Sequence, residues 1–209
     1  MKKQKTSQKR KENFIYSDFK SSWSYVFKNI NYIYFAIFVF VLFVALAIIF
    51  PAPAQLEEQI RLMIQKLILK TENLSPLNLI SFIFVNNLTV GIVAVLLGVL
   101  FSVIPFFIAA SNGYVLGYIV KLTISKVGLG AGIFSLWKIL PHGIFELPAI
   151  FIGLGLGMKL GVLLLQSLNK NSFKLFLENL FLAIKVIFYV ILPLLVIAAF
   201  IEGSLIKLL

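Results

Sequence analysis

Long apolar stretches are the feature that most limits what this chain can fold into. Asn31 to Phe50 is a run of 20 residues without a charged side chain. At 1.5 Å per residue, a helix of that length spans about 30 Å, the hydrocarbon thickness of a bilayer. Charged residues make up only 13% of the 209 residues, against about 25% in soluble domains. The sequence therefore predicts an all-α integral membrane protein.

The distribution of basic residues predicts how the chain crosses the membrane. Eight of the 19 Lys and Arg residues lie within residues 1–30, and Lys170 and Lys174 lie in a later polar segment. Basic segments stay on the cytoplasmic side, so this pattern accounts for the net charge of +11 without a nucleic-acid partner. We expect a multi-pass cell-membrane protein with a cytoplasmic N-terminus and an outside C-terminus. About five transmembrane helices are predicted, at residues 31–50, 77–110, 114–135, 140–165 and 180–200.

Two segments are predicted to lie outside the bilayer core. Residues 1–30 form a basic cytoplasmic tail and interfacial segment, with 1–20 flexible, and residues 31–209 form a single transmembrane domain. Aromatic residues alternate with lysines between Phe14 and Lys28, which suits either a helix at the lipid headgroups or a simple lead into the first span. Gln55 to Asn73 has amphipathic helical periodicity. We expect that helix to lie on the outer membrane surface or to cap the bundle.

The middle of the chain is predicted to be irregular. Ser111-Asn112-Gly113 favours a turn, and Pro105 is expected to kink or end the segment before it. The third span carries several glycines and two lysines, so it is predicted to be broken or re-entrant, which requires burial in protein or contact with water.

A histidine and a glutamate lie within an apolar stretch. His142, the only histidine, precedes Glu146 by four residues, a spacing that puts both on one face of a helix. Ionisable groups inside a membrane are costly and need a partner or a purpose. The predicted topology brings Asn86, Asn87 and Glu202 to the same outer leaflet, and Asn112 to the opposite end. We therefore predict a polar pocket that faces outward.

Four interpretations of this pocket remain open. His142, Glu146 and Glu202 could bind a divalent metal such as zinc, which in catalytic sites has three protein ligands and an open position. The helix start at Pro141 to Gly143 could bind an anionic headgroup. His142 and Glu146 could relay protons, or form a structural ion pair. The absence of a second histidine excludes the His-Glu-x-x-His pattern of zinc proteases.

Small residues recur at helical spacing in two of the predicted spans. Such stripes allow transmembrane helices to approach closely, within one subunit or between the subunits of a homodimer. The glycines assigned to helix packing are Gly91, Gly98, Gly153, Gly157 and Gly161.

These motifs also resemble a known family. Pro141-His-Gly-x-x-Glu146-x-Pro-Ala149 with the glycines that follow, Asn86-Asn87, Asn112-Gly113 and Ile201-Glu202 are similar to the pattern of the stage II sporulation protein M family over about residues 35–205. The resemblance implies a polytopic membrane protein. In the sporulation member it implies a role in localising or scaffolding membrane-anchored cell-wall-degrading proteins during engulfment.

The resemblance carries no catalytic assignment, although it makes Asn87, Asn112, His142, Glu146 and Glu202 motif positions. We therefore expect a scaffold or localisation factor for membrane or envelope partners, and not an enzyme. The alternative is a metal-binding intramembrane enzyme, or a transporter of a small solute, ion or lipid, that uses the outer pocket around His142 and Glu146.

Overall fold

The computed structural model describes residues 2–100, 102–137, 140–168 and 173–206, with side chains in 15–100, 102–130, 143–168 and 173–201. Within these ranges the chain forms helices and no strand. They are α1 (Lys2–Lys28), α2 (Ile30–Ile49), α3 (Ala54–Thr71), α4 (Pro76–Leu97), α5 (Val103–Trp137), α6 (Leu140–Ser167), α7 (Phe173–Val186), the π-helical turn η1 (Ile187–Ile191) and α8 (Leu192–Ile206).

Five segments are long and apolar enough to cross a bilayer, which confirms the predicted fold class. They are 30–49, 76–97, 103–130, 143–167 and 173–201. The last span joins α7, η1 and α8. Pro193 has no N–H for the carbonyl of Tyr189, and the wider π-helical turn just before it absorbs this loss. The amphipathic α3 is not among the five candidate spans.

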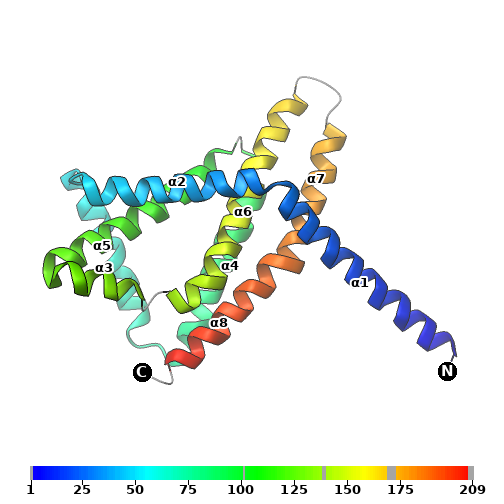
Figure 1. The fold of residues 1–209 in the computed structure, drawn as a ribbon, viewed down its shortest axis with the longest axis horizontal. Helices are drawn as coiled ribbons and strands as arrows, with labels where there is room; N and C mark the ends of the chain where they lie inside the picture. The colour runs from blue at the N-terminus through cyan, green and yellow to red at the C-terminus, as the bar shows by residue number, and fades with distance from the viewer. Residues whose placement is uncertain (1, 101, 138–139, 169–172, 207–209) are drawn as a thin grey trace.

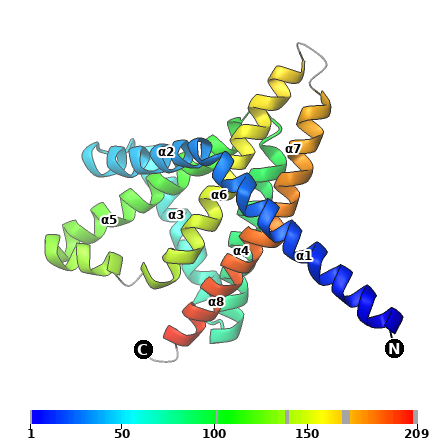
Figure 2. The ribbon, with the colours of Figure 1, turned by 45° about the vertical axis from the view of Figure 1, so that its right-hand side comes forward.

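The spans form two groups that diverge from each other (Figures 1 and 2). One group contains α4, α6, α7 and α8, and the other is an arm in which α2 and α5 pack along each other. Gly113 and Gly117 make that pairing close, because a methyl group at either position would overlap backbone atoms of Phe40 or Val44. The arm joins the bundle at α6, where Gly155 lies against Ile33 and Gly157 against Pro105.

The boundary between the second and third spans differs from the sequence prediction. Helix α4 ends at Leu97, α5 begins at Val103, and Ser102 between them has a positive φ of 65°. Pro105 falls in the first turn of α5, where the missing N–H is harmless. The predicted turn at 111–113 is wrong, because these residues lie inside α5 and Gly113 serves the close contact with α2. The third span is broken instead at Gly128.

The N-terminal segment is helical. Helix α1 runs from Lys2 to Lys28, which spans most of the predicted tail and interfacial segment. Neither glycine nor proline occurs in this stretch, so nothing in it opposes helix formation strongly.

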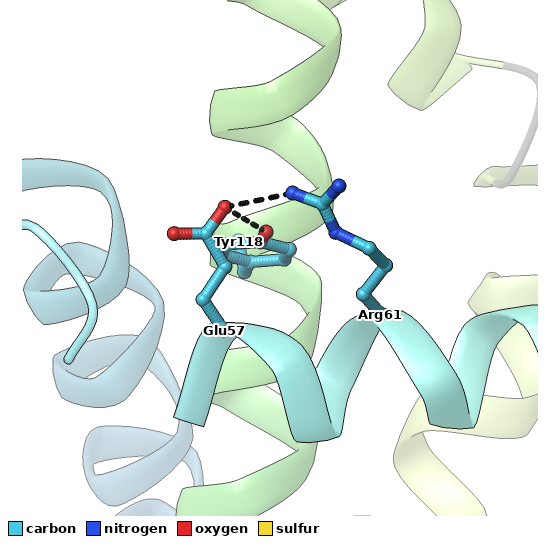
Figure 3. A network of polar contacts seen from close by, with 3 residues as sticks. All are labelled: Glu57, Arg61 and Tyr118. Atoms are coloured by element: carbon cyan, nitrogen blue, oxygen red, sulfur yellow. Dashed lines mark hydrogen bonds and ion pairs between the residues drawn. The ribbon is translucent and has the colours of Figure 1, made fainter. Parts of the chain in front are cut away.

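A small polar network attaches helix α3 to α5 (Figure 3). The Tyr118 hydroxyl on α5 donates to Glu57 Oε1 at 3.0 Å, and Arg61 pairs with the same oxygen at 3.1 Å. Lys121 donates to the carbonyl of Phe50 at 2.9 Å, just before α3 begins. These contacts fix the start of α3, while much of its remaining surface is exposed.

Candidate functional site

Two of the predicted pocket residues line the same cavity where α4, α6 and α8 meet. Asn87 on α4 and Glu146 on α6 border a space of about 10 Å³ together with apolar side chains of α4 and α8, which is about the room that one water molecule needs. Asn87 is only 8% exposed, and Glu146 is half-buried and has an interaction partner. The fold thus joins two polar groups that are 59 residues apart in the chain.

The backbones of two further candidates lie near this cavity. His142 lies in α6 one turn before Glu146, and Glu202 lies in α8 one turn after Ala198, which borders the cavity. The start of α6 and the end of α8 lie at the same end of the bundle (Figure 1). The side chains of His142 and Glu202 are outside the described residues. The described side chains contain no group of three His, Cys, Asp or Glu placed to hold a metal ion. The zinc site therefore stays a prediction.

The other two candidates point elsewhere. Asn86 is exposed on α4 and lines a separate surface hollow with Asn78 and Thr89, while its Nδ2 lies 3.5 Å from Asn87 Oδ1. Asn112 is exposed in the middle of α5, where its Nδ2 donates to the carbonyl of Ile108 at 2.8 Å. Asn112 is therefore a helix residue and takes no part in the cavity.

The glycines assigned to helix packing lie where α4 and α6 approach most closely. A methyl group at Gly98 would overlap the Gly157 carbonyl, and one at Gly157 would overlap the Ala94 carbonyl. A methyl group at Gly161 would lie 2.5 Å from the Gly98 carbonyl oxygen. At Gly153 the nearest atom is the Gly91 carbonyl oxygen at 3.1 Å, and at Gly91 it is Ile191 Cγ2 at 3.4 Å. The two helices therefore touch backbone to backbone over two to three turns.

A second polar site, which sequence reasoning missed, joins α1, α6 and α7. Lys159 Nζ donates to Asn179 Oδ1 at 2.6 Å and to the Tyr25 hydroxyl at 3.2 Å, and it lies 4.4 Å from the centre of the Tyr25 ring. Tyr25 in turn donates to Asn179 Oδ1 at 2.9 Å. Tyr25 is 6% exposed and Asn179 8%, and burial raises the pKa of the Tyr25 hydroxyl. The sequence signal was a lysine within the apolar, glycine-rich part of α6.

An ion pair joins α1 and α7 at a second point. Lys185 on α7 lies 2.5 Å from Asp18 on α1, and both side chains are mostly buried. Residues 15–28 of α1 therefore pack against α7 and η1. Their buried face continues the core of the bundle through Tyr25 and Val26.

Comparison with known proteins agrees with this architecture. The family model described as stage II sporulation protein M matches residues 11–205. This range covers all five candidate spans and includes Asn87, Glu146 and most of α1. No curated protein and no solved structure gives a significant match. The chain belongs to the stage II sporulation protein M family of polytopic membrane proteins.

Proposed function

We propose that this protein is a membrane scaffold that holds membrane or envelope partners in place, and that it is not an enzyme. The observation that supports this role is the backbone contact between α4 and α6 at Gly98, Gly157 and Gly161. Helices packed in this way have little freedom to slide or separate. A stiff bundle suits a protein whose task is to keep attached elements at fixed positions.

Helix α3 is the element best suited to meet a partner. Its first turns are fixed to the arm through Glu57 and Tyr118, while Leu67, Ile68 and Leu69 in its last turns are more than half exposed. Apolar side chains of this size, next to lysines on the same helix, are typical of a surface that binds protein or membrane. In the proposed topology, with a cytoplasmic N-terminus, α3 lies on the outer side, where envelope proteins are available.

Site-specific photocrosslinking in native membranes tests the scaffold role. A photoreactive amino acid at Leu67 or Leu69 is expected to give discrete adducts with another protein. The same amino acid at Phe38 or Val41, which are equally exposed on the apolar α2, serves as the matched control and is expected to give lipid adducts. Lipid adducts alone at the α3 positions would refute display to a partner, as would adducts of two copies of this chain.

A second function, the handling of an ion, a proton or a small polar ligand, is favoured by the cavity that Asn87 and Glu146 share. Glu146→Gln keeps the size of the side chain and removes its charge. In proteoliposomes this change should abolish any flux that depends on the cavity, whereas Glu178→Gln, an exposed position on α7, should leave it unchanged. A scaffold with an intact fold should tolerate both changes.

The metal hypothesis has a separate test. Elemental analysis of protein purified without chelator, alongside His142→Ala and Glu146→Gln, measures bound zinc. Near-stoichiometric zinc that is lost in both variants would support a metal site. No zinc in any sample after zinc addition would refute one.

A further inference from the structure

Helix α1 carries a four-residue repeat between Asp18 and Asn29 that divides its surface into three stripes. The sequence runs Asp-Phe-Lys-Ser, Ser-Trp-Ser-Tyr, Val-Phe-Lys-Asn. Residues four apart lie on the same side of a helix. Buried residues from the first and fourth positions of the repeat together form the stripe that faces the bundle. The second residues form an aromatic stripe and the third residues form a stripe of lysine and serine.

The first stripe fixes the rotation of α1. Its members, Asp18, Ser22, Tyr25 and Asn29, are all buried. Asp18 pairs with Lys185, and Tyr25 bonds with Asn179 and Lys159. Two polar contacts almost two turns apart leave α1 little freedom to roll about its axis.

The aromatic stripe lies beside the buried stripe, with Phe19 and Phe27 exposed and Trp23 partly buried. Phe19, Trp23 and Phe27 form a ladder along α1, with ring centres 6.4 Å and 5.9 Å apart. Trp23 packs partly against the core, and Phe27 is 65% exposed. Exposed aromatic rings in a row are expensive in water and typical of the membrane interface.

The third stripe is cationic, and no acidic side chain of residues 15–28 lies on it. Lys20, Ser24 and Lys28 are exposed, while Asp18, the one acidic residue between 15 and 28, is turned inward to Lys185. The outer face of this part of α1 therefore presents positive charge only. Such a surface complements anionic lipid headgroups.

The position of α1 in the chain adds to this argument. Helix α2, the first membrane span, begins at Ile30, two residues after Lys28. The end of α1 must therefore lie where the first span enters the bilayer. An aromatic stripe beside a lysine stripe at that depth can place the rings among the acyl carbonyls and the ammonium groups near the phosphates.

We propose that residues 18–28 of α1 form a rotationally fixed contact with anionic lipid headgroups, in which Phe19, Trp23 and Phe27 enter the interface and Lys20 and Lys28 bind lipid phosphates. The bundle holds the helix in this orientation through Asp18–Lys185 and the Tyr25 contacts. This contact does not depend on the scaffold role, so either proposal can fail alone.

Fluorescence of the full chain in lipid nanodiscs tests the proposal. The chain has two tryptophans, so Trp137→Phe leaves Trp23 as the single reporter. Bromine atoms placed near the headgroups should quench Trp23 at least about twofold more strongly than bromine atoms near the bilayer centre, as for an interfacial tryptophan. Replacing neutral phosphatidylcholine by a mixture with phosphatidylglycerol should increase this quenching, and high salt should reverse the increase.

Paired lysine variants assign the lipid effect to the proposed stripe. Lys20→Gln with Lys28→Gln should abolish the dependence on phosphatidylglycerol. Lys66→Gln with Lys70→Gln, a matched pair on α3, should retain it. Unchanged unfolding of each variant in detergent is the control for intact folding.

Three results would overturn the proposal. The first is quenching of Trp23 by aqueous iodide but not by brominated lipid, which would place the stripe in water. The second is a dependence on phosphatidylglycerol that survives Lys20→Gln with Lys28→Gln. The third is shielding of Trp23 from both quenchers in nanodiscs made from native membranes to which brominated lipid has been added, which would mean that a protein covers the stripe.

Discussion

The contact between α4 and α6 makes a graded prediction about methyl groups added at glycine. Gly157→Ala places a methyl group where it would overlap the Ala94 carbonyl oxygen and lie 2.8 Å from the Ala94 carbonyl carbon and 2.9 Å from Pro105 Cγ. Two of these three atoms belong to a helix backbone, which cannot rotate away as the end of a flexible side chain would. The two helices must therefore separate.

The size of the effect follows from these distances. Relieving the 2.8 Å contact to an ordinary 3.4 Å requires a movement of 0.6 Å, and the overlap with the oxygen requires more. A gap of that size forfeits about a quarter or more of the dispersion energy of each contact along it. Overpacked cores lose about 1–3 kcal/mol, and alanine returns up to about 1 kcal/mol through its helix propensity. We expect Gly157→Ala to lower the free energy of unfolding by about 2 kcal/mol.

Unfolding by SDS in mixed micelles, followed by tryptophan fluorescence, measures this change. Gly143→Ala on the same helix is the matched control. Among the described side chains its methyl group would meet only Leu147, at 3.7 Å and 3.9 Å, so the change in stability should be less than about 1 kcal/mol. Gly91→Ala, at 3.4 Å from Ile191 Cγ2, should fall between them. If Gly157→Ala and Gly143→Ala unfold at the same SDS fraction as the unchanged protein, the reasoning about helix contact is refuted.

Three further predictions concern the α1 junction and the break in α5. Asn179→Leu removes the hydrogen-bond acceptor for Lys159 and should lower the free energy of unfolding by about 2 kcal/mol. Tyr25→Phe leaves the hydrogen bond between Lys159 and Asn179 and should lower it by about 1 kcal/mol. Equal losses of the two variants in SDS unfolding would contradict this prediction. Burial raises the pKa of Tyr25, so the folded state keeps a proton that the unfolded chain releases above about pH 10. Stability should therefore fall above about pH 10 by more than in Tyr25→Phe, and an equal pH dependence of unfolding in the two proteins would argue against it. Gly128 has φ 84° and ψ 166°, a region used almost only by glycine, so Gly128→Ala should cost about 1–3 kcal/mol. Gly130→Ala, whose methyl group would meet none of the described residues within 4 Å, should not destabilise the protein. Similar unfolding of the two variants would disprove the strain at Gly128.

Sequence reasoning worked best where the deciding property is local. Each of the five candidate spans follows from the number of consecutive apolar residues needed to cross a bilayer. The amphipathic helix at Ala54–Thr71 follows from a periodicity that its own residues carry. The choice of Gly98, Gly157 and Gly161 for helix packing rests on the same kind of pattern, since small residues at steps of four form a stripe on any helix.

Glycine showed where such reasoning fails. The pair Asn112-Gly113 led to the prediction of a turn, but Gly113 lies within α5, against the backbone of Phe40. The chain turns between α4 and α5 instead, where Ser102 adopts a positive φ and its hydroxyl donates to the Met158 carbonyl at 2.6 Å. Because glycine has no side chain, it suits a turn and a close helix contact equally well. Which of the two it forms depends on whether another helix packs against it.

By itself, the sequence determined the membrane class, the number of spans, the amphipathic α3 and some of the residues that form polar sites. Only the tertiary structure decided which of them meet. It brings Asn87 to Glu146 but leaves Asn86 and Asn112 elsewhere. It also joins Lys159 to Asn179 and to Tyr25, which is 134 residues away in the chain. The physical reason is that apolar length and periodicity are properties of one segment, whereas a contact between polar groups depends on the rotation and register of several helices at once.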